Sequence, residues 1–199
     1  MVNGEKKILI VGAHPDDAEY GAGGFLQMFG KALICVVFPM GRADEARAGA
    51  DELGADCAVM DFDAENARER ALIENLDEII GRFKPNVICT HSLTGVHQDH
   101  RLVARSVISA CRAFTGMVLF FGTPSDHPFA ANLFVELTDA QFEKKLTALR
   151  KHKSQANRPY MQSQALHTHF NYWNEAYQGK SGRWVEPFVL HRNVIRRTG

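Results

Sequence analysis

Short apolar runs alternate with helical patterns along the first half of the chain. Four runs are continuous and mostly apolar, as expected for strands covered on both faces of a parallel sheet, and they span residues 7–13, 32–38, 58–62 and 86–90. Between them, apolar residues recur with helical spacing at about residues 18–29, 43–53 and 68–83. This alternation predicts a three-layer α/β/α, Rossmann-like fold with a mostly parallel sheet.

Residues that end helices support these boundaries. Pro85 restricts the residue before it and ends the third helix, and Gly54 is suited to cap the second. Further along, we expect a helix after Asp99, strands at 117–121 and 133–137, and a helix at 138–151 whose Thr-Asp-Ala-Gln start resembles a capping box.

The last fifty residues are rich in aromatic and histidine side chains and have mixed periodicity. They predict only an irregular, partly helical region. No internal repeat, low-complexity tract or long linker divides the chain, so we expect residues 1–199 to form a single domain.

Composition and charge exclude several classes of protein. With 199 residues, 45% of them hydrophobic, the chain can bury a substantial core. Lys and Arg balance Asp and Glu at 23 each, so there is no basic field for a nucleic-acid partner. The apolar runs are far shorter than the roughly 20 residues that a membrane-spanning helix needs. We therefore expect a cytoplasmic protein with no transmembrane segment and no nucleic-acid partner, and the sequence leaves open whether it forms a homo-oligomer.

The four cysteines do not predict a metal site. None belongs to a Cys-x-x-Cys pair, and each lies in an apolar run, where free cysteine packs as a small hydrophobic residue: Cys35, Cys57, Cys89 and Cys111. We expect buried thiols.

Two loops of the predicted sheet carry the candidate chemistry. His14-Pro-Asp-Asp17 follows the first strand and His97-Gln-Asp-His100 follows the fourth, where ligands of an open parallel sheet bind. Two adjacent acids in a dry pocket would repel unless a cation kept both ionised. An imidazole at 14, a carboxylate at 17 and a second imidazole from the other loop would supply the three protein ligands that catalytic zinc commonly uses.

Each motif also has a structural alternative. Asp16 or Asp17 could cap a helix, and His97 and His100 could be a surface pair on a first helical turn. The alternative function is a metal-free, Rossmann-like binding module for a sugar or nucleotide. However, the nearby glycines do not follow the strand directly, as a dinucleotide fingerprint requires. The coincidence of two acid and histidine clusters at strand ends favours the metal site.

The same motifs resemble those of the PIG-L/LmbE family of zinc-dependent N-deacetylases. The resemblance rests on His14-Pro-Asp-Asp-Ala-Glu19, Gly21-Ala-Gly-Gly24 and His97-Gln-Asp-His100. It continues through Arg42-Ala-Asp-Glu-Ala, Leu53-Gly54, His152-Lys-Ser-Gln155 and Trp184-Val-Glu-Pro-Phe188, so it covers most of the chain.

The resemblance implies a division of roles. It implies that His14, Asp17 and His100 bind Zn²⁺, that Asp16 is the general base, and that His97 assists at the reacting carbonyl with Asp99 beside it. The implied substrate is an N-acetylglucosamine-type sugar or glycoconjugate, which would yield acetate and a free amine. Some family members have a tyrosine two residues before the assisting histidine, whereas this chain has Gly95.

Three further residues are candidate substrate contacts. Arg42 follows the second strand and could hold a hydroxyl or phosphate, or be an ordinary solvated arginine. Lys153, near Gln155, matches a family feature near the substrate and also belongs to a basic helix face. Glu186 could accept hydrogen bonds from sugar hydroxyls, or be a buried glutamate bonded to backbone. The role of His91, at the end of the fourth strand, stays undecided.

Overall fold

The sheet contains seven strands, and six of them run in the same direction. The computed structural model describes residues 6–126, 128–177 and 184–194. The strand order is β3-β2-β1-β4-β5-β7-β6, and β7 runs antiparallel to both of its neighbours. The strands are β1 (Lys7–Gly12), β2 (Lys31–Val36), β3 (Asp56–Val59), β4 (Val87–His91), β5 (Met117–Phe121), β6 (Leu133–Leu137) and β7 (Trp184–Arg192).

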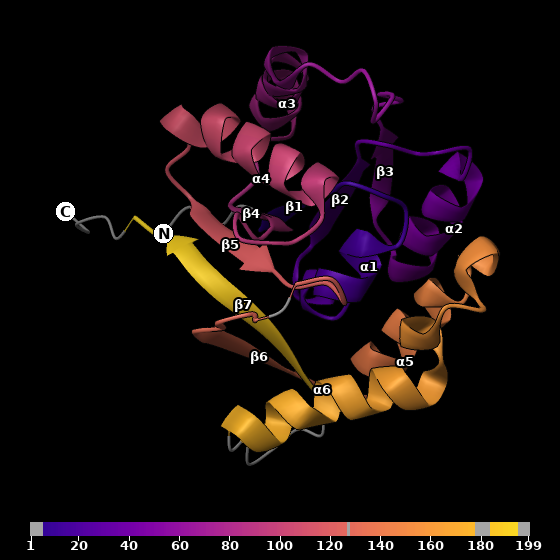
Figure 1. Cartoon of the computed structure of the whole chain (residues 1–199). Coiled ribbons are helices and arrows are strands. Elements are labelled where there is room, and N and C mark those ends of the chain that lie inside the picture. The colour runs from indigo at the N-terminus through magenta and orange to yellow at the C-terminus, as the bar shows by residue number, and fades with distance from the viewer. Residues whose placement is uncertain (1–5, 127, 178–183, 195–199) are drawn as a thin grey trace.

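Helices cover both faces of this sheet (Figure 1). The helices are α1 (Asp17–Ala22), α2 (Ala43–Leu53), α3 (Glu69–Phe83), α4 (Gln98–Ala110), α5 (Asp139–Leu149) and α6 (Ser163–Tyr177). One core joins the sheet to α3 and α4, and the other joins it to α1, α2 and α5. Ile8 and Ile10 of β1 belong to one core, while Leu9 and Val11 belong to the other. The continuous apolar run of β1 therefore reflects burial on both sides, and the three-layer α/β/α prediction is confirmed.

Local signals in the sequence account for several helix ends. Thr138 caps α5 and exchanges hydrogen bonds with Gln141 in a capping box, as predicted. Gly54 follows α2 with φ +76°, a left-handed conformation that glycine adopts without steric cost. The third helix ends at Phe83, just before Pro85, also as predicted. The third strand begins and ends earlier than expected, at Asp56–Val59 rather than residues 58–62.

The helix expected at residues 18–29 is divided into two shorter pieces. Helix α1 stops at Ala22, and a 3-10 turn follows at Phe25–Met28. The backbone N–H groups of Gly24 and Phe25 each donate to the carboxylate of Glu186, at 2.7 Å in both cases. Because this buried side chain engages those amides, they are not available to continue the helix.

The C-terminal region is more regular than the expected irregular segment. Its long helix α6 packs along β7, and β7 is an inner strand between β5 and β6. Pro187 lies inside β7, where proline disfavours a strand assignment from sequence. A third apolar cluster, which includes Phe142 of α5 and Phe170 of α6, joins these two helices.

Two other expectations concern membrane-spanning helices and the cysteines. Within them, no helix has the length and hydrophobicity needed to cross a lipid bilayer. All four cysteines are free thiols, and three are buried while Cys57 is partly exposed.

Candidate metal centre

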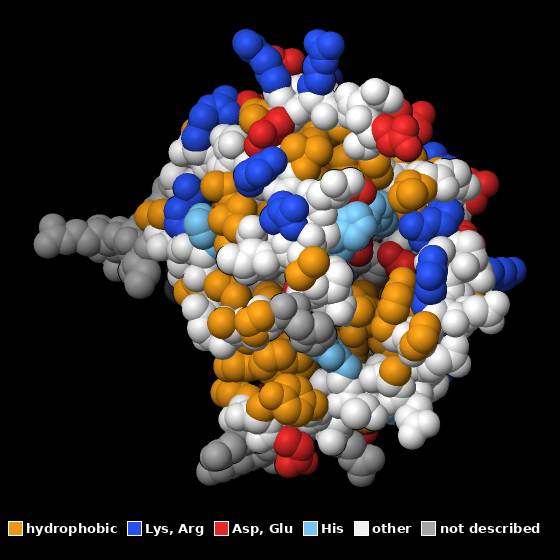
Figure 2. All heavy atoms as spheres, in the orientation of Figure 1, with side chains coloured by type: hydrophobic (Ala, Val, Ile, Leu, Met, Phe, Trp, Pro, Cys, Tyr) orange, Lys and Arg blue, Asp and Glu red, His pale blue; other side chains and the backbone are white. Residues whose placement is uncertain are grey.

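The two loops singled out from the sequence meet at the carboxyl ends of β1 and β4. His14 follows β1, Asp17 begins α1, and His100 lies in the first turn of α4. All three line a cavity of about 380 Å³, together with Asp16, His97 and other residues. Figure 2 shows histidine and acidic side chains together in a hollow on this face of the molecule.

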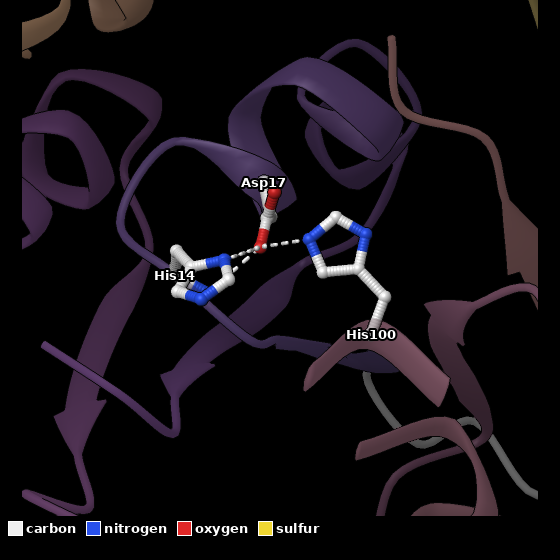
Figure 3. A group of neighbouring side chains, drawn as sticks. All are labelled: His14, Asp17 and His100. Carbon is white, nitrogen blue, oxygen red and sulfur yellow. Dashed lines mark hydrogen bonds and ion pairs between the residues drawn. The ribbon is translucent and has the colours of Figure 1, made fainter. Parts of the chain in front are cut away.

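One carboxylate oxygen stands at the centre of the cluster (Figure 3). Asp17 Oδ2 lies 3.5 Å from His14 Nδ1 and 3.5 Å from His100 Nε2. In a tetrahedral zinc site with bonds of about 2.0–2.2 Å, neighbouring ligand atoms are about 3.3–3.6 Å apart. The donor types and their spacing therefore fit a divalent cation such as zinc, with a position left for water or substrate.

The surroundings keep Asp17 ionised. Burial raises the pKa of its carboxyl, but the nearby His91, His14 and His100 hold that pKa well below the usual range. Burial, followed by the proximity of His91, lowers the pKa of His100 to about 3. His100 is therefore a neutral imidazole at physiological pH, which is the form that binds a metal.

Asp16 has a different environment although it is the next residue to Asp17. Burial and the charge of Asp17 raise its pKa to about 7, while Arg42 and His152 act in the opposite direction. Its backbone has φ +98°, a strained conformation for a residue other than glycine. Arg42 Nη1 lies 3.7 Å from Asp16 Oδ2 and donates to the carbonyl oxygen of Pro15 at 3.2 Å.

Asp99 contacts a different histidine from the one expected. Its carboxylate Oδ2 bonds to His14 Nε2 at 2.9 Å, whereas His97 Nδ1 is 3.9 Å from the same oxygen. His97 Nδ1 instead accepts a hydrogen bond from the backbone N–H of Asp99 at 3.2 Å, as the N-cap of α4. Burial lowers the pKa of His14, but its bonds to Asp17 and Asp99 outweigh this effect and raise the pKa.

His91 belongs to this cluster, although the sequence alone left its role undecided. Its ring is fully buried and stacks on the ring of His100 with centroids 3.9 Å apart. His91 Nε2 accepts the backbone N–H of Ala13 at 2.8 Å and lies 3.3 Å from Asp17 Oδ2. Its position as the last residue of β4 was the available signal, since strand ends meet at the site.

The three candidate substrate contacts fall in different places. Arg42 lines the cavity. Lys153 is exposed and is not among the lining residues, although Gln155 of the same segment is. Glu186 is fully buried, accepts the backbone N–H groups of Gly24 and Phe25 after α1, and bonds to Lys145. The structure therefore shows the backbone-bonded alternative for Glu186 and not a position in the cavity.

Comparison with known proteins places the chain among deacetylases. The family model described as "PIG-L: GlcNAc-PI de-N-acetylase" matches residues 9–111. The uncharacterized deacetylase YaiS of Escherichia coli K12 is 32% identical over 174 residues, which cover 76% of this chain and 93% of that protein.

Solved structures share the fold. N,N'-diacetylchitobiose deacetylase from Pyrococcus horikoshii has a TM-score of 0.77 and 20% identity, covering 92% of this chain and 83% of that one. GalB, a 4-carboxy-2-hydroxymuconate hydratase from Pseudomonas putida KT2440, has a TM-score of 0.82 and 16% identity, covering 97% and 99%. Because the two enzymes differ in reaction, structural likeness alone does not select the chemistry. The family match and the similarity to YaiS do so at the level of the family: the chain belongs to the PIG-L/LmbE deacetylases.

Proposed function

We propose that this protein is a zinc-dependent hydrolase that removes the N-acetyl group from an N-acetylglucosamine-type sugar or glycoconjugate. The products are acetate and a free amine. The observation that carries the proposal is the convergence of His14 Nδ1, Asp17 Oδ2 and His100 Nε2 in one cavity with a separate carboxylate, Asp16. Three donors beside a base are the parts that metal-assisted amide hydrolysis needs.

The metal and the base have distinct tasks. When bound, zinc polarises a carbonyl oxygen and lowers the pKa of a bound water to about 7. His14, Asp17 and His100 would hold the ion, and Asp99 fixes the ring of His14 through its bond to Nε2. Asp16, outside the donor set, accepts a proton from the water that attacks the acetamide carbon.

His97 has the geometry of a hydrogen-bond donor. Its Nδ1 accepts the backbone N–H of Asp99, so the N–H of the ring lies on Nε2. Its side chain is 44% exposed and lines the cavity. From there Nε2–H donates a hydrogen bond to the carbonyl oxygen as negative charge develops, and the proton that Asp16 accepts from water passes to the leaving amine.

The substrate class is supported by the comparisons and by the cavity. The matching family model is described by a GlcNAc-containing substrate, and the Pyrococcus horikoshii structure is named for a diacetylated chitobiose. Arg42, Gln155 and Tyr160 line the cavity and carry groups that bond sugar hydroxyls. We propose Arg42 as the contact nearest the base, since it lies 3.7 Å from Asp16.

Metal analysis with an amine-release assay tests the proposal. We expect the purified protein to bind about one zinc per chain, and a chelator to abolish amine release from N-acetylglucosamine and its glycosides until zinc is restored. A zinc-loaded protein that releases no amine from any N-acetylated sugar would overturn the hydrolase. Sugar binding unaffected by chelation, with no turnover, would instead support the metal-free binding module.

A further inference from the structure

A second cluster of possible metal ligands shares His100 with the candidate metal centre. Ligand atoms of His91, His100 and Asp126 lie within 4.8 Å of one another, and all three side chains are buried. Asp126 follows β5, so a third strand end joins the two loops already described. The cluster has the residue types of a metal site, but its hydrogen bonds assign it a different role.

The contacts of His91 and the proposed metal ligation of His100 both favour a proton on Nδ1. His91 Nε2 accepts the N–H of Ala13, so the N–H of this ring lies on Nδ1. His100 Nε2 faces Asp17 and must be unprotonated to hold the proposed zinc, so its proton also lies on Nδ1. A neutral imidazole has one nitrogen with a free lone pair, and in each of these two rings that nitrogen, Nε2, already has a partner. The second cluster therefore presents N–H donors and does not suit a cation.

Asp126 is the acceptor for this cluster. Its Oδ2 accepts the Thr123 backbone N–H at 2.8 Å and the Thr123 hydroxyl at 2.9 Å. Its Oδ1 is buried and has no hydrogen-bond partner within the described parts of the protein, and the same holds for His91 Nδ1. An unpaired donor and an unpaired carboxylate oxygen are thus complementary within one buried cluster.

Thr123 connects Asp126 to the metal ligand. Its Oγ1 lies 3.5 Å from His100 Nδ1 and donates to Asp126 Oδ2, so its lone pairs are free to accept from Nδ1–H and from the Ser125 hydroxyl at 3.0 Å. The series from His100 Nδ1 through the hydroxyl to the carboxylate has one consistent direction of donation. Carboxylates that fix metal-ligating histidines in this way commonly act through the ring nitrogen opposite the metal.

We propose that Asp126, acting through Thr123, is a positioning residue that fixes the tautomer and orientation of His100 so that Nε2 faces the cation. The inference rests on the proposed function only for the presence of the cation. Asp99 does the same for His14 from the other side, through a direct bond. Each of the two ligating imidazoles therefore has its own carboxylate.

The position of Asp126 also explains why residue 95 is a glycine. A Cβ at this position would lie 2.3 Å from Asp126 Oδ1, closer than nonbonded atoms approach. Any larger residue would displace the carboxylate. Glycine, in place of the tyrosine found in some family members, therefore fits the position of Asp126 in this chain.

Zinc affinity and tautomer state test the proposal without an activity assay. Asp126→Asn and Thr123→Val are each nearly isosteric, and each should weaken zinc binding about 10-fold to 100-fold in competition with a chromophoric chelator. Thr123→Ser keeps the hydroxyl and should restore affinity to within about 3-fold of wild type. Ser106→Ala removes a buried hydroxyl from the same helix as His100 and should leave affinity unchanged, since this hydroxyl donates to the carbonyl oxygen of Leu102 within the same helix.

Long-range ¹H–¹⁵N spectra of the metal-free protein report the tautomer directly. We expect His100 to carry its proton on Nδ1 in wild type and in Thr123→Ser, and to lose that preference in Asp126→Asn. Unchanged zinc affinity in Asp126→Asn and Thr123→Val, or a metal-free wild type with the proton on Nε2, would overturn the proposal. Failure of the wild type to deacetylate sugars would instead contradict the proposed function and leave these readouts intact.

Discussion

Two groups of buried charged residues lie near the two ends of α1, and their charges are balanced in different ways. At one end, Lys145 Nζ donates to Glu186 at 2.5 Å and to the carbonyl oxygen of Tyr20 at 2.6 Å, over the ring of Phe170. Glu186 also accepts two backbone amides. At the other end, Asp16 and Asp17 are adjacent acids that share a cavity with several imidazoles.

The difference is in how the charges are balanced. Lys145 and Glu186 are both fully buried, and each charge is matched by its partner and by backbone groups. In the metal centre, burial and the charge of Asp17 raise the pKa of Asp16 to about 7 despite the nearby Arg42, and His100 is neutral, so positive charge does not fully balance the two adjacent acids. Burial of a charged side chain is therefore a poor marker of function, whereas unbalanced acids and neutral imidazoles around a cavity indicate a place for a cation.

The largest expected effect separates the two adjacent acids. Asp16→Asn should lower turnover about 10²-fold to 10⁴-fold, because the amide cannot accept the proton from the attacking water. Zinc content should stay near wild type, since Asp16 is outside the donor set. Steady-state amine release and metal analysis on the same preparation measure both quantities.

Asp17→Asn is the matched control for that experiment. It replaces the central carboxylate with a neutral amide, which is a weaker zinc ligand, so zinc content should fall together with activity. Equal zinc loss in the two variants would contradict the assignment of separate roles to Asp16 and Asp17.

On the structural side, breaking the buried pair should affect stability and not chemistry. Lys145→Met leaves the Glu186 carboxylate buried without its ion partner and should cost about 3–5 kcal/mol of unfolding free energy. The exposed neighbour Lys144→Met should cost less than about 0.5 kcal/mol. Denaturant unfolding measures both, and turnover per folded Lys145→Met molecule should match wild type. Lost turnover in fully folded protein would contradict the structural assignment.

Substitution of Asp99 should have a smaller effect, on zinc affinity. Asp99→Asn replaces the carboxylate that bonds His14 Nε2, and it should weaken zinc binding about 10-fold to 100-fold. Chelator competition measures the affinity. If Asp99 instead acts mainly on His97, turnover will fall while zinc affinity stays at the wild-type value.

The smallest expected effect is a pH-dependent change in stability at the buried pair His152–Glu19. His152 Nε2 lies 3.1 Å from Glu19 Oε1. Burial lowers the pKa of His152, but the hydrogen bond and charge of Glu19 raise it further than burial lowers it. A histidine whose pKa is raised in the folded state stabilises that state fully at pH values below its unfolded pKa of about 6.5. This stabilisation is lost as the pH rises through the folded-state pKa. The melting-temperature difference between wild type and His152→Gln should therefore be larger at pH 5.5 than at pH 8.5. A difference that grows with pH would contradict this.

The sequence predicted those parts of the molecule whose signals are local. The buried strands β1 and β4, the Thr138 capping box and the loops that carry His14 and His100 all follow from short-range patterns. Adjacency of strand ends in a parallel sheet then explains why two loops 80 residues apart were expected to meet.

The remaining features depend on contacts between distant segments. Helix α1 ends early because Glu186, in β7, binds the amides of Gly24 and Phe25. Asp126 becomes significant only when a third strand end is placed beside the first two. Neither relation has a periodic or local signature, so no single-segment pattern could reveal it.

The most direct test of the central claim is an anomalous diffraction experiment at the zinc absorption edge on crystals of the zinc-loaded protein. The account predicts one strong peak, about 2.0–2.2 Å from His14 Nδ1, Asp17 Oδ2 and His100 Nε2. A peak elsewhere in the molecule, or none at this position with zinc in excess, would contradict it.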